Sequence, residues 1–151
     1  MKCLLRLVDA LEAQLAHFEN RNSTISTANV GWHIEHSCLV ITKIIQTVSQ
    51  SNPASYQWKW NSRRVMVFIL GKFPRGRAEA PASVLPGQEI SKDHLIQSIQ
   101  QTRNAIANLS SCSKHQHFKH PFFGVLNKSS TIYFLGIHTK HHLRIIEDIL
   151  K

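Results

Sequence analysis

Apolar residues recur at spacings of three and four in four separate segments of this chain, and no other feature constrains the fold as strongly. Residues at these spacings share one face of an α-helix, so each segment predicts an amphipathic helix. No pair of alternating strand patterns accompanies them, and the sequence therefore predicts an all-α fold. The four stripes comprise Leu4, Val8, Leu11, Leu15 and Phe18; Val30, Ile34, Ser37, Ile41, Ile44 and Val48; Leu95, Ile99, Thr102, Ile106 and Leu109; and Leu135, Ile145, Ile146 and Ile149.

The second segment carries apolar residues on more than one side. Trp32, Leu39 and Val40 lie off its main stripe. A helix that is apolar nearly all round is usually buried at the centre of a domain, so this one is predicted to be central. Ser26 or Thr27 is expected to cap its start, because both side chains can accept a backbone hydrogen bond.

The segments between the stripes are predicted to connect them. Residues 65–70 form an apolar run without a partner strand, which favours a short helix. Residues 72–88 contain several prolines and glycines and predict a long connection between the second and third main helices, and residues 110–130 predict a loop. Ser91 is expected to cap the third helix. Together these features predict a four-helix bundle formed by a single domain over residues 1–151.

Membrane insertion and secretion are not indicated by the sequence. No apolar run approaches the roughly 20 residues of a membrane-spanning helix. Arg6, Asp9 and Glu12 interrupt the apolar start of the chain, which a signal peptide would keep uncharged. The three cysteines have no CxxC spacing and are expected to be free thiols. We therefore expect a cytoplasmic protein with no membrane among its partners.

The net charge of +9 invites the hypothesis of an anionic partner. The basic segment 59–77 contains no acidic residue, but it carries no nucleic-acid-binding signature and no glycine-rich phosphate loop. A solvated basic face and a site for an anionic ligand both remain open, and nucleic acid is not favoured as a partner. The cations of this segment are Lys59, Arg63, Arg64, Lys72, Arg75 and Arg77.

His138 and His142 stand four residues apart in the last segment, on the face that carries its isoleucines. Positions four apart differ by about 40° around a helix, so both imidazoles are expected in the apolar stripe. A buried imidazole needs partners for its nitrogens, since an unsatisfied polar group costs roughly 1–3 kcal/mol. Hydrogen bonds would meet this need for each ring separately. A shared metal ion would meet it for both, because histidines at i and i+4 can bind one ion.

A third ligand would have to come from another helix, and the second helix offers His33 and His36. His33 lies nearer the middle of the main apolar stripe, whereas His36 lies further round the helix. Helical geometry therefore mildly favours His33, although it discriminates poorly on a helix that is apolar on several sides.

Four phrases in a fixed order carry a resemblance to a known family: "WHIEHSCLV", "PRGRAEAP", "HPFFG" and the final "FLGIHTKHHLRIIEDIL". Over nearly its whole length the chain resembles the DinB/YfiT-like metalloenzyme superfamily, and within it a bacterial family of unknown function. The resemblance implies a four-helix bundle in which one histidine of the second helix and two of the last helix hold a metal ion. On this sequence these are His36, His138 and His142, with His33 as the alternative to His36. His141 lies at the edge of the face and is expected outside the ligand set.

The resemblance also implies a function. The expected cofactor is a single divalent ion, and zinc or nickel suits imidazole ligands. The expected chemistry is metal-dependent transfer or hydrolysis of a small-molecule substrate, with a low-molecular-weight thiol as co-substrate, in a monomer or a homodimer. The sequence has no HExxH phrase and no paired Glu-x-x-His phrases, which excludes a zincin protease and a di-iron bundle.

The reactive group is therefore expected to be water or substrate held by the ion. A Glu base is not expected, because Glu35 points away from the ligand face of the second helix. The alternative hypothesis is a non-catalytic helical protein that binds an anion or nucleic acid and uses its histidines as a structural cluster.

Overall fold

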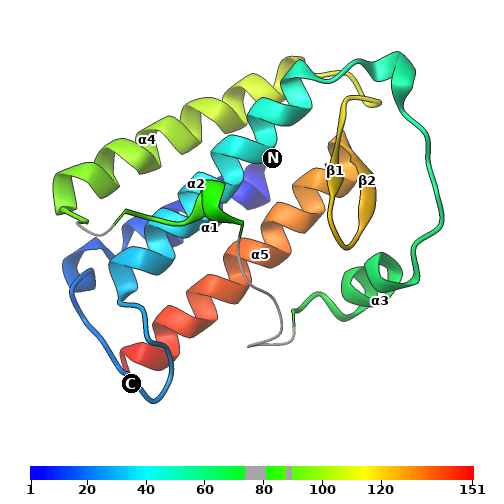
Figure 1. Ribbon diagram of the computed structural model, residues 1–151. Helices are drawn as coiled ribbons and strands as arrows, with labels where there is room; N and C mark the ends of the chain where they lie inside the picture. The colour runs from blue at the N-terminus through cyan, green and yellow to red at the C-terminus, as the bar shows by residue number, and fades with distance from the viewer. Residues whose placement is uncertain (74–80, 88–89) are drawn as a thin grey trace.

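The long helices of the computed structural model, which describes residues 1–73, 81–87 and 90–151, lie in the four amphipathic segments. The first helix is shorter than its predicted stripe, because Leu15 lies in a separate 3-10 helix and Phe18 follows that helix. The long helices are α1 (Lys2–Glu12), α2 (Val30–Gln50), α4 (Lys92–Asn108) and α5 (Lys128–Ile149). Helices α1 and α2 each pack against both α4 and α5. Figure 1 shows α2, α4 and α5 running side by side along the length of the molecule. The prediction of a mostly helical fold is therefore confirmed.

The apolar stripes meet in the core between these helices. Leu11 of α1, Ile34 and Ile41 of α2, Ile99 of α4 and Ile146 of α5 are all fully buried. Burying one such side chain stabilises the fold by roughly 1.5–3 kcal/mol. Helix α2 is the most enclosed element, since every residue from Val30 to Cys38 except Trp32 is buried. The expected central position of this helix is confirmed.

The helices begin at side-chain caps, and one of the predicted caps was wrong. Ser91 caps α4 as expected, with its side chain accepting a hydrogen bond from the backbone nitrogen of His94. The cap of α2 is Asn29, and neither Ser26 nor Thr27 takes this place. Asn ranks with Ser as an N-cap, so a run of several polar residues leaves the choice among them undetermined. Asn61 and Asn127 cap the helices that follow them.

Residues 110–130 were predicted to form a loop, and this prediction was wrong. Strands β1 (His117–His120) and β2 (Gly124–Asn127) pair in antiparallel register as a hairpin beside α5. Gly124 has a φ of 68°, a left-handed conformation that favours glycine at the end of the turn. Strands of four residues offer too few alternations to be recognised from the sequence alone. The all-α prediction is corrected to a mostly helical fold with a small two-stranded sheet.

The apolar run 65–70 lies in a short helix, as predicted. This helix, α3 (Ser62–Leu70), ends at Gly71, whose φ of 60° makes a left-handed C-cap. Figure 1 shows α3 beside the hairpin and apart from the long helices. The predicted connection 72–88 falls partly outside the described residues, and within them it contains a 3-10 helix, Ala82–Val84. Across the described ranges, no helix combines the length and the hydropathy needed to cross a bilayer.

Candidate metal centre

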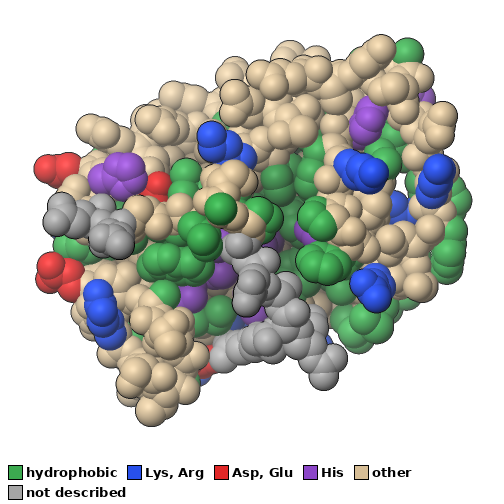
Figure 2. Space-filling model, in the orientation of Figure 1, with side chains coloured by type: hydrophobic (Ala, Val, Ile, Leu, Met, Phe, Trp, Pro, Cys, Tyr) green, Lys and Arg blue, Asp and Glu red, His purple; other side chains and the backbone are tan. Residues whose placement is uncertain are grey.

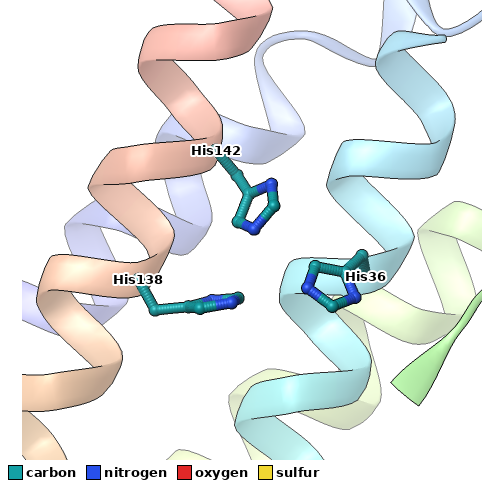
Figure 3. Close-up of side chains that lie close together, drawn as sticks. All are labelled: His36, His138 and His142. Atoms are coloured by element: carbon teal, nitrogen blue, oxygen red, sulfur yellow. The ribbon is translucent and has the colours of Figure 1, made fainter. Parts of the chain in front are cut away.

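Two histidines of α5 and one of α2 converge between these helices. His138 and His142 lie one turn apart on α5, and His36 faces them from α2 (Figure 3). One nitrogen of each ring lies within 4.8 Å of the others. The ring centroids of His36 lie 5.2 Å from His138 and 4.7 Å from His142, and those of His138 and His142 lie 4.6 Å apart.

This cluster could hold one metal ion. Nitrogens about 2.1 Å from a shared ion lie roughly 3–4 Å from one another, so a small rotation of the rings brings the three into range. Two adjacent turns of one helix would supply two ligands, and the packing of α2 on α5 would supply the third.

The ring of His36 is held in one tautomer by the long connection. Its Nδ1 atom lies 2.8 Å from the carbonyl oxygen of Val84, at the end of the 3-10 helix Ala82–Val84. A carbonyl oxygen only accepts hydrogen bonds, so Nδ1 donates and Nε2 keeps its lone pair. Hydrogen bonds of this kind, from the second ring nitrogen to a carbonyl, commonly orient histidines that bind metals. The connection therefore orients His36 for binding through Nε2.

A fourth histidine contacts the cluster from behind. The Nδ1 atom of His33 lies 3.0 Å from the Nδ1 atom of His142, and its Nε2 atom lies 3.0 Å from the hydroxyl oxygen of Ser26. Only one hydrogen fits between two ring nitrogens. If His142 donates it, the Nε2 atom of His142 keeps a lone pair on the side of the cluster. The serine hydroxyl accepts the remaining hydrogen of His33, because a hydroxyl can accept as well as donate.

The Nδ1 atom of His138 is buried and has no hydrogen-bond partner among the described residues. A buried polar atom without a partner costs roughly 1–3 kcal/mol. A cation bound at this atom would replace the missing hydrogen bond. This orphaned nitrogen, together with the lone pairs left on His36 and His142, fits a divalent metal ion.

Burial keeps these imidazoles uncharged. It lowers the pKa of His142 far below the ordinary 6.5, and the neighbouring His138 and His36 lower it further. Burial is also the main reason that the pKa of His138 lies well below 6.5. The pKa of His36 is lowered by burial as well, against an opposite effect of its hydrogen bond to Val84. Neutral imidazoles have free lone pairs, so the cluster is ready to bind a metal near neutral pH.

Aromatic rings enclose the cluster on two sides. The indole of Trp32 stacks on His36 with the ring centroids 4.9 Å apart. Phe73 and Phe134 lie with their centroids 6.3 and 6.0 Å from that of His138. His36 and His142 are buried, whereas His138 is partly accessible. A ligand would therefore approach the cluster from the side of His138.

A pocket of about 440 Å³ is lined in part by Trp32. Its lining combines the apolar Phe18 and Ile90 with the charged Glu19 and Arg21. Trp32 thus forms part of the pocket wall and also packs on His36. A small molecule in this pocket would contact the residue that stacks on His36.

The other candidate residues of the sequence lie around the cluster but outside it. His33 contacts His142 without joining the cluster, and the ring of His141 meets that of His142 edge-on at 5.2 Å. Glu35 is buried on another side of α2, where its Oε1 atom lies 3.1 Å from Nε2 of His94 on α4. Its predicted direction away from the histidines is confirmed.

The basic segment 59–77 is not one solvated face. Arg64 is buried, with its guanidinium donating to backbone carbonyl oxygens, whereas Lys59, Arg63 and Lys72 are exposed. Arg75 and Arg77 lie outside the described residues, so the part of the segment beyond Phe73 stays a prediction.

Sequence reasoning missed the partners that orient the rings. The carbonyl of Val84 has no signature in the sequence, because every residue carries a carbonyl group. Ser26 was recognised only as a candidate cap, and it contacts His33 instead. His120 was assigned to a loop, but its Nδ1 accepts hydrogen bonds from the backbone nitrogens of Phe122 and Phe123 and closes the hairpin turn.

Comparison with known proteins assigns the chain to a family. No curated protein and no solved structure matches the chain. The family model described as the DinB superfamily matches residues 3–146, nearly the entire length. The histidine cluster lies within this matched region. The chain therefore belongs to the DinB superfamily.

Proposed function

We propose that this protein is a mononuclear metal-binding member of its superfamily, with a four-helix-bundle core and with His36, His138 and His142 as the metal ligands. The convergence of these three neutral imidazoles between α2 and α5 carries the proposal. Zinc or nickel is the ion that suits such a ligand set best. A divalent ion held by neutral ligands alone keeps its full charge and supplies Lewis acidity at an open coordination position.

We further propose that the protein is a metal-dependent transferase or hydrolase acting on a small molecule, with a low-molecular-weight thiol as co-substrate. The residues of the chain contribute orientation and shielding. Val84 and His33 hold the rings of His36 and His142 in place. Trp32 and Phe73 exclude water from two sides, which strengthens electrostatic interactions inside the site.

The decisive experiment measures metal content per chain after loading with Zn²⁺ or Ni²⁺ and removal of the excess. The wild-type protein should hold one ion, and His36→Ala, His138→Ala and His142→Ala should each lose it. His17→Ala is the matched control, because His17 is exposed and lies outside the cluster. Full occupancy in all three cluster variants would overturn the ligand assignment.

The reaction class needs a second experiment. The zinc- and nickel-loaded proteins are assayed with a panel of thiol-transfer and hydrolysis substrates, and His142→Ala is assayed beside them under the same metal concentration. Turnover that the loaded wild type shows and the variant lacks supports the enzymatic proposal. A protein that binds metal but turns over no member of the panel would favour a structural role for the cluster.

A further inference from the structure

Helix α3 buries one cation together with an apolar residue and leaves several aliphatic side chains exposed. Arg64 is buried, with an exposed fraction of 6 %, whereas Ile69 of the same helix is 79 % exposed. Met66 and Leu70 are more than half exposed as well. A surface helix of a soluble protein normally buries its apolar stripe and exposes its charges. Helix α3 buries Arg64 beside Val67 and exposes a second group of apolar side chains on its outer side.

Arg64 is held in its buried position by the contacts that it makes. Its guanidinium donates to the carbonyl oxygens of Lys59 at 2.6 Å and Val125 at 3.1 Å, and lies 5.6 Å from the ring centroid of Trp58. Charge-assisted hydrogen bonds of this kind are roughly twice as strong as neutral ones. Arg64 thus fixes α3 against the hairpin, and the opposite, aliphatic side of the helix is held outward.

The segment that leads into α3 exposes apolar side chains as well. Trp58 and Trp60 precede α3 and are 61 % and 68 % exposed. We call the exposed side chains of Trp58, Trp60, Met66, Ile69 and Leu70 the α3 surface. Figure 2 shows hydrophobic side chains along the edge of the molecule where α3 and the segment before it lie. Apolar patches of this kind usually mark an interaction site.

The charges around the α3 surface have one sign. Lys59, Arg63 and Lys72 are exposed beside it. The sequence holds no acidic residue from 36 to 78 or from 94 to 146, so α3, the segment before it and the hairpin contain none. On the face shown in Figure 2 the acidic side chains lie toward the left-hand end, away from α3. A partner of this surface must therefore be anionic as well as apolar.

We propose that the α3 surface binds the surface of an anionic lipid bilayer. Trp58 and Trp60 would lie at the headgroup level, where tryptophan is enriched, and Met66, Ile69 and Leu70 would enter the acyl boundary. The exposed cations would contact the lipid phosphates, since basic residues near an anionic leaflet are attracted to it.

Two other occupants fit the surface less well. A second copy of the chain would bring the same cations face to face, because a two-fold interface places one patch against itself. Nucleic acid would match the cations and the indoles, but aliphatic side chains can neither stack on bases nor hydrogen-bond to them. The lipid contact requires no spanning helix, so it does not conflict with the finding that no described helix could cross a bilayer. It goes beyond the sequence-based expectation, which named no membrane among the partners.

The test is co-sedimentation of the full chain with vesicles of phosphatidylcholine alone and of phosphatidylcholine mixed with phosphatidylglycerol. The protein should bind the mixed vesicles, more weakly at high salt, and should bind the neutral vesicles far less. The double variant Ile69→Ser, Leu70→Ser should lose affinity for the mixed vesicles by about tenfold or more. Its fold should be unchanged, because both side chains are exposed.

Matched controls separate this surface from the rest of the molecule. Ile96→Ser alters an exposed aliphatic residue of α4, and Arg144→Glu alters an exposed cation of α5. Neither should weaken binding, whereas Arg63→Glu should. The tryptophan emission should shift to shorter wavelength on binding, and the shift should shrink in a Trp58→Ser, Trp60→Ser variant.

Three results would overturn the proposal. The first is equal binding to both kinds of vesicle, or binding that the Ile69→Ser, Leu70→Ser variant retains in full. The second is a stable dimer in sedimentation equilibrium that this variant dissociates, which would assign the surface to a second copy. The third is a single-stranded oligonucleotide that binds in place of the vesicles and depends on the same residues. None of these outcomes involves the metal site, so the two proposals stand or fall separately.

Discussion

The Nδ1 atoms of His33 on α2 and His142 on α5 lie 3.0 Å apart, in hydrogen-bond contact across the packed interface of the two helices. His142 belongs to the cluster that it forms with His36 and His138, whereas His33 lies outside this cluster. The contact links the choice of tautomer at His142 to a neighbour that is itself held by Ser26. If His142 donates a hydrogen bond through Nδ1, the lone pair of its Nε2 atom is free to bind a metal ion.

This relationship predicts the effect of removing His33. His33→Leu should weaken zinc affinity by roughly 10–100-fold while the protein still binds one ion, because the outer partner orients His142 without replacing it. His33→Asn should retain more affinity, since its amide oxygen can still accept from Nδ1 of His142. Competition with a chromophoric chelator measures both constants. Unchanged affinity in His33→Leu would show that the contact has no orienting role.

Metal affinity should depend on pH in one direction. Protons and the ion compete for the same lone pairs, so affinity should fall as pH decreases. Because burial lowers the pKa of His138 and His142 well below 6.5, competition at these rings should begin only in distinctly acidic solution. Zinc titrations between about pH 8 and pH 5 test this. A steep loss of affinity as the pH falls from about 8 to 7 would contradict it, since rings with such a low pKa take up no protons in that range.

Acid should destabilise the metal-free protein partly through His120. Burial lowers the pKa of His120 to about 4, from 6.5 in the unfolded chain. As pH falls below 6.5 the unfolded state takes up the proton first, so stability decreases between 6.5 and about 4 and then levels off. His120→Asn should make this decrease shallower in urea unfolding at a series of pH values. His17→Asn, at an exposed position, is the control and should leave the slope as in the wild type.

Arg64 should contribute more to the free energy of unfolding than the neighbouring Arg63. Arg64→Leu would leave the carbonyl oxygens of Lys59 and Val125 without their donor, which should cost about 1–3 kcal/mol in the free energy of unfolding. Arg63→Leu changes an exposed side chain and should stay within about 0.5 kcal/mol of the wild type. Denaturant unfolding followed by circular dichroism compares the two. Equal stability of both variants would contradict the role assigned to Arg64.

The sequence by itself determined the long helices and two members of the cluster. Both follow from local periodicity: apolar residues at spacings of three and four must share a helical face, and so must His138 and His142. Family resemblance then favoured His36, although the helical geometry mildly favoured His33. The structure places His36 in the cluster and His33 behind it.

Only the tertiary structure shows that His36, and not His33, lies in the cluster with His138 and His142, because a helix that is apolar on several sides does not reveal which side meets α5. The same limit applies to the carbonyl of Val84, which reaches His36 from 48 residues along the chain. It applies also to α3, where contacts with the hairpin bury Arg64 while Ile69 and Leu70 of the same helix are exposed. Periodicity reports the faces of an element, whereas the direction in which each face points depends on residues that are distant in the sequence.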